Sequence, residues 1–151
     1  MTVDDLIKIL QASIGPVVLI SGVALLLLTL TNRLGRVSDR IRMLCQEIRR
    51  GLGDDVVHTK RQIGFLYLRS KYLRMSIILS ILAIVCVSVI IFALFSIYIF
   101  HLDLIALVEF LFSSSLIALI LSLLFFLRDV LASLQSLQIE IDITMKNSAK
   151  I

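Results

Sequence analysis

Apolar side chains form three long stretches in this chain, at residues 9–32, 75–100 and 104–127. A helix rises about 1.5 Å per residue, so each stretch is long enough to cross a hydrocarbon core of about 30 Å. Glu109 is the one formally charged residue inside them. Hydrophobic residues fill 59% of the 151 positions, which leaves too few polar side chains to cover a soluble domain. The pattern predicts an all-α membrane protein with three transmembrane helices.

Apolar positions continue beyond each stretch at spacings of three and four residues, which is typical of a seam between packed helices. They are Leu34, Val37, Ile41, Leu44 and Ile48 after the first stretch, Val56, Ile63, Leu66, Ser70, Leu73 and Ile77 with Thr59 around the second, and Leu127, Val130, Leu134, Leu137 and Ile141 after the third. We therefore expect each span to extend into the cytoplasm, where the helices form a coiled-coil-like bundle. The alternative is a set of separate amphipathic helices lying on the membrane surface.

These elements divide the chain into six segments. We expect an outer amphipathic interfacial helix at 1–14, span one with its extension at 15–50, a turn at 51–55, a cytoplasmic helix with span two at 56–102, span three with its extension at 103–145, and a tail at 146–151. Gly51 and Gly53 supply the helix stop in the turn. Pro16 favours a helix start near that position, although a mild kink in one continuous helix is an alternative.

Basic residues are concentrated between the first two spans. Residues 33–74 hold 11 of the 15 Lys and Arg residues, whereas residues 1–8 and 101–103 hold one. By the positive-inside rule the basic loop is cytoplasmic, the N-terminus lies outside and the C-terminus lies inside. A nucleic-acid partner is not expected, because no aromatic residues interleave a basic face and no zinc-ligand spacing accompanies it.

Candidate functional residues fall into two groups. Glu109 lies in the third span, where an ionisable group commonly marks an ion path, a proton relay or a polar pair. Pairing with His101 or snorkelling to the outer surface is the structural alternative for Glu109. The second group surrounds the inner exits of the helices, where cations meet anionic headgroups. It comprises Arg33, Arg36, Arg40, Arg42, Arg74 and Arg128, together with Asp39, which is spaced to pair with Arg36 or Arg42.

The residues carry no signal for catalysis, a cofactor or a metal. His101, Asp103 and Glu109 lack a recognised ligand spacing, and neither Cys45 nor Cys86 has a CxxC partner. We therefore expect no enzyme activity, no cofactor and no metal site.

Several short motifs resemble a bacterial family of small three-span membrane proteins of unknown function. The matching segments are residues 14–22 (IGPVVLISG), 30–33 (LTNR), 37–42 (VSDRIR), and 126–130 with Ser133 and Leu134. The resemblance implies a bacterial cytoplasmic-membrane protein and brings no established activity. Its most specific residues, Pro16, Asn32, Arg33, Asp39, Arg40 and Arg42, place any shared function at the first span and its inner exit.

The expected function is that of a non-enzymatic oligomeric scaffold or partner-docking protein. Long helices with narrow apolar seams and few loops have little other surface for recognition. The expected partners are anionic lipid headgroups at the cytoplasmic face and copies of the chain or a larger membrane complex. The alternative is an ion-conducting or transport-related homo-oligomer with Glu109 near its outer mouth.

Overall fold

Each apolar stretch belongs to one long helix in the computed structural model of the protein, which describes residues 3–51, 56–100 and 105–148. The helices are α1 (Val3–Arg49), α2 (Val56–Phe100) and α3 (Ile105–Ser148). All three are long and apolar enough to cross a membrane. Their lengths of 47, 45 and 44 residues correspond to roughly 65–70 Å, about twice a hydrocarbon core. The all-α architecture with three membrane-crossing helices is confirmed.

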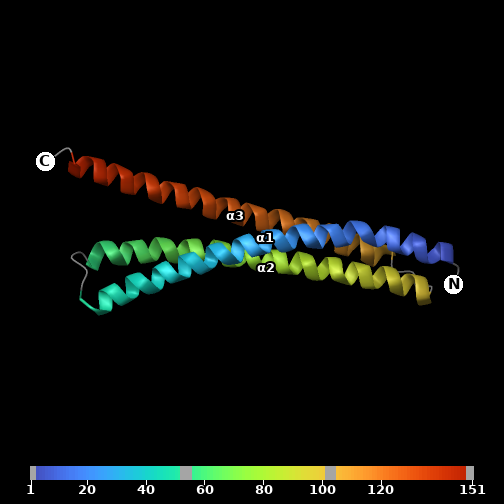
Figure 1. Ribbon diagram of the computed structural model, residues 1–151. Helices are drawn as coiled ribbons and strands as arrows, with labels where there is room; N and C mark the ends of the chain where they lie inside the picture. Colours follow the sequence, from blue (N-terminus) through green and yellow to red (C-terminus); the bar gives the residue numbers. More distant parts are fainter. Residues whose placement is uncertain (1–2, 52–55, 101–104, 149–151) are drawn as a thin grey trace.

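Helix α2 is the middle element, because both α1 and α3 pack along it. The start of α1 and the end of α3 lie at opposite ends of the molecule (Figure 1). The C-terminal part of α3 diverges from the α1–α2 hairpin instead of packing along it (Figure 1). The three extensions therefore do not form one bundle (Figure 1).

Helix α1 runs without interruption through Pro16, which is half-buried. From Val3 onward the structure therefore has one continuous helix and not a separate interfacial helix. At its other end, Gly51 has a φ of +67°, and its N–H donates a hydrogen bond to the carbonyl of Ile48. This left-handed conformation favours glycine and is typical of a helix end, as expected for the turn.

The α1–α2 contact follows the predicted seam. Val23, Leu30, Val37 and Leu44 are buried at intervals of seven residues along α1. Leu30 and Val37 form the core cluster with Leu73 of α2, and both Leu30 and Leu73 are fully buried. The positions predicted from spacing on these two helices are thus buried or half-buried wherever their side chains are described.

The predicted seam of α3 is wrong at Leu127 and Leu134, whereas Val130 is half-buried and Leu137 and Ile141 lie outside the described side chains. Leu127 and Leu134 are 52% and 55% exposed, whereas Ser115, Ser122 and Asp129 are buried. Close packing of membrane helices favours small residues at the contact and leaves large apolar side chains to the lipid. The same preference explains why α3 turns its small and polar residues, and not its leucines, toward α2.

Candidate functional site

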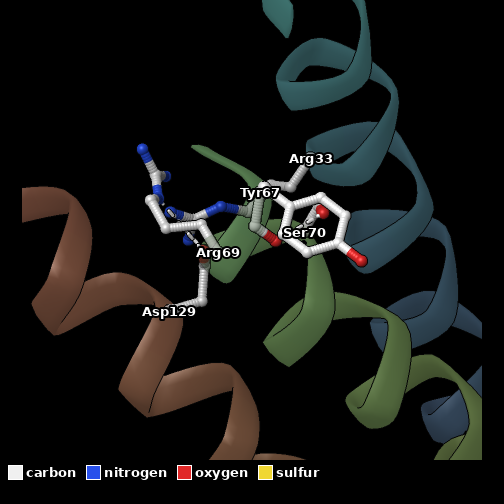
Figure 2. Close-up of polar contacts among 5 residues, drawn as sticks. All are labelled: Arg33, Tyr67, Arg69, Ser70 and Asp129. Atoms are coloured by element: carbon white, nitrogen blue, oxygen red, sulfur yellow. Dashed lines mark hydrogen bonds and ion pairs between the residues drawn. The ribbon is translucent and has the colours of Figure 1, made fainter. Parts of the chain in front are cut away.

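Asp129 of α3 joins all three helices through two ion pairs. Its Oδ2 lies 3.3 Å from Nη2 of Arg33 on α1, and its Oδ1 lies 3.2 Å from Nε of Arg69 on α2 (Figure 2). The Asp129 side chain is fully buried, while those of Arg33 and Arg69 are 23% and 16% exposed. We call these three residues the Asp129 clamp. The clamp links α1 directly to α3, although both helices pack mainly on α2.

The clamp has more positive than negative charge. A buried carboxylate is costly without paired charges and hydrogen bonds, and the two guanidinium groups supply that compensation. Nε of Arg69 donates a hydrogen bond to Oδ1, whereas Oδ2 faces Arg33 as an ion pair without a hydrogen bond of good geometry. One carboxylate and two guanidinium groups leave a net charge of +1.

Aromatic rings line the same level of the bundle. The guanidinium of Arg33 lies 5.3 Å from the ring centroid of Phe126, and that of Arg128 lies 5.6 Å from the ring centroid of Tyr72. Tyr72 in turn stacks on Phe125 with a centroid separation of 6.5 Å. These cation–π and stacking contacts attach α3 to both neighbours around the clamp.

Three serines form a buried cluster between α2 and α3. The hydroxyl of Ser76 donates to the carbonyl of Ser122 over 2.8 Å, and the hydroxyl of Ser122 donates to the carbonyl of Ser76 over 2.8 Å. The hydroxyl groups of Ser80 and Ser122 are 2.7 Å apart. All three side chains are fully buried. Small side chains allow the two backbones to approach, and the hydroxyl groups satisfy one another across the contact.

A groove between α1 and α2 adjoins the clamp. It has a volume of about 430 Å³ and is lined by Arg33, Arg36, Val37, Arg40, Leu66 and Arg69. Every titratable residue in this lining is an arginine, so the groove is cationic.

A family model described as a protein of unknown function (DUF2721) matches residues 13–139. The chain belongs to the DUF2721 family. This confirms the resemblance to a membrane-protein family of unknown function. No curated protein and no solved structure gives a significant match to the chain. The clamp, the serine cluster and the groove all lie within the part matched to DUF2721.

The predicted basic residues of this DUF2721 protein have different surroundings. Arg33 belongs to the clamp and Arg128 contacts Tyr72, whereas most of the others are exposed. The exposed candidates are the polar residues Asn32 and Asp39 and the basic residues Arg36, Arg40, Arg42, Arg74 and Arg128. Among the described residues Asp39 makes no ion pair with Arg36 or Arg42, so the pairing considered from spacing is not formed.

Glu109 is exposed on α3, on the same side of that helix as the exposed Ser113. The nearby Ser115 is buried, and its hydroxyl donates to the carbonyl of Phe112 over 2.8 Å. His101 and Asp103 lie outside the described residues. Within the described part of the DUF2721 chain, no group of three His, Cys, Asp or Glu residues is placed to hold a metal ion.

Spacing and charge counts did not single out Asp129, and they gave Arg69 only as one of the 11 basic residues at 33–74. Asp129 directly follows Arg128 and entered only as part of the segment 126–130 that resembles the family. The available signal was a second periodicity, because Ser115, Ser122 and Asp129 are spaced seven residues apart. A polar stripe of that period within an apolar helix indicates a packed helix face.

Proposed function

We propose that this DUF2721 protein is a non-enzymatic assembly protein, whose copies associate through the polar extension of α3. The observation that carries this proposal is an unpartnered apolar stripe at Leu127, Leu131 and Leu134. These side chains are 52%, 55% and 55% exposed. Leu131 and Leu134 follow Arg128 and Asp129 at the inner end of the candidate span Ile105–Leu134, where a second copy can cover them in place of lipid.

A second copy of the chain is the occupant that we propose for the stripe. The spacing of four and three residues is that of a seam between two helices. This face of α3 is free of the chain's own helices, because all three leucines are more than half exposed. The same face on a second copy is complementary to it around a two-fold axis.

Light scattering of the purified protein, corrected for bound detergent, tests the proposal. We expect a mass that is a multiple of 17.0 kDa for the native chain. The double variant Leu131→Gln with Leu134→Gln should shift the mass to that of one chain, since it removes the apolar contact. Met43→Gln is the matched control, because Met43 is 54% exposed on α1 and lies outside the stripe. A native chain that is monomeric without partners would contradict the proposal.

Ion conduction is the alternative function, and the same preparation separates it from assembly. Protein in liposomes should pass no ions if it only assembles. Ion flux that is lost in Glu109→Gln would instead favour a conducting oligomer with this residue at its mouth. Activity toward a substrate in the pure protein would contradict the non-enzymatic role.

We further propose that the chain lies in the bacterial cytoplasmic membrane with its N-terminus outside and its C-terminus inside. The basic extensions of α1 and α2 support this orientation by the positive-inside rule.

Cys45 is a native probe of this orientation, because it is exposed on the polar extension of α1. We expect a membrane-impermeant maleimide to label it in inside-out vesicles and not in intact spheroplasts. Cys45→Ser should abolish the labelling, since Cys86 lies within the apolar part of α2 and is only half-exposed. Labelling of Cys45 in intact spheroplasts would indicate the opposite orientation.

A further inference from the structure

We propose that the groove between α1 and α2 is a binding site for the phosphate headgroup of an anionic phospholipid. The proposal is independent of self-assembly, because it rests on the lining of this groove and not on the leucine stripe of α3. Four arginines surround a volume of about 430 Å³, which has room for a phosphate and its glycerol.

The charge of the groove is the first reason. Asp129 neutralises one of the two clamp arginines, while Arg36 and Arg40 add two further positive charges. The nearest acid along α1 is Asp39, which is exposed and forms no ion pair with the described residues. The groove therefore keeps a charge of +3 that an anion can compensate, or +2 if Asp39 is counted.

The donors in the groove are the second reason. A guanidinium has five N–H donors in a planar fork that matches phosphate oxygens. Arg33 and Arg69 each contact Asp129 through a single nitrogen, which leaves donors on both side chains for a ligand. Asp129 thus holds two arginines in place beside the groove while using little of their hydrogen-bonding capacity.

The position of the groove favours a lipid over a soluble anion. Arg33 is the first cation after the apolar stretch of α1, so the groove lies at the headgroup level. Val37 and Leu66 give the groove an apolar wall. Three helical turns before Arg36, Leu25 occupies nearly the same side of α1 and is 69% exposed. An acyl chain can lie along Leu25 while its phosphate contacts the arginines.

Native mass spectrometry of the full-length protein with added lipid tests the site. We expect phosphatidylglycerol to remain bound more strongly than phosphatidylcholine, whose choline masks the phosphate charge. The double variant Arg36→Gln with Arg40→Gln should weaken phosphatidylglycerol binding about tenfold. Arg42→Gln with Arg49→Gln is the matched control, because it removes the same charge from exposed positions of α1 outside the groove.

Three outcomes would overturn the proposal. The two double variants could weaken lipid binding equally, which would indicate general attraction to charge. Phosphatidylcholine could bind as strongly as phosphatidylglycerol. Inorganic phosphate alone could displace the lipid at millimolar concentration, which would make the groove a site for a soluble anion. All four substituted arginines are exposed, so circular dichroism should show the native helix content in both variants.

Discussion

Replacing Asp129 with asparagine is expected to lower the free energy of unfolding by about 3–5 kcal/mol. The substitution leaves the guanidinium groups of Arg33 and Arg69 mostly buried beside each other without the carboxylate that separates them. The resulting repulsion acts where α1, α2 and α3 meet. Unfolding in mixed micelles, followed by circular dichroism, measures the loss.

A matched control and a compensating variant distinguish the clamp from general charge effects. Asp39→Asn removes an exposed carboxylate from α1 and should change the stability by less than about 0.5 kcal/mol. Replacing Arg33 and Arg69 by methionine together with Asp129→Leu should restore most of the stability, because apolar residues can replace a buried ion pair at little cost. Equal losses in Asp129→Asn and Asp39→Asn would refute a stabilising clamp.

Ser122→Leu should destabilise the protein by about 2–3 kcal/mol. Ser122 is fully buried where α2 and α3 approach, and its hydroxyl shares hydrogen bonds with Ser76 and Ser80. Leucine would force the helices apart, and it would remove the hydroxyl that accepts from Ser80 and donates to the carbonyl of Ser76. Ser122→Ala keeps the close approach and should cost only about 1 kcal/mol.

The same micelle titration measures this effect, with Ser113→Leu as its control. Ser113 lies on α3 and is exposed, so a leucine there should leave the stability nearly unchanged. A loss in Ser122→Ala as large as that in Ser122→Leu would show that hydrogen bonding, and not close packing, dominates the contact.

The seams of α1 and α2 were predictable because their buried residues are the apolar ones. Val37, Leu44 and Leu73 have the spacing of a helix face and are buried in the structure. The same reasoning failed on α3, where Leu127 and Leu134 are exposed. In a membrane helix apolar residues are favourable on every side, so their spacing alone does not tell which side faces protein.

The candidate site was predicted in part. The basic exit of the first span indicated Arg33, but nothing in the charge count indicated which of the neighbouring arginines would have a buried partner. That partner, Asp129, lies 96 residues further along the chain. Local spacing carries no information about a pairing at such a separation, because the pairing depends on how α3 is rotated and placed against α2.

The sequence by itself determined that the protein has three helices able to cross a membrane, with basic extensions and few connecting residues. Helix length and hydropathy are local properties, and the bilayer thickness converts them directly into spans. Only the tertiary structure decided that Asp129 joins Arg33 to Arg69, that three serines lie between α2 and α3, and that the leucines of α3 remain uncovered. These features depend on the relative rotation of the helices. Close packing of small residues and pairing of buried charges together determine that rotation.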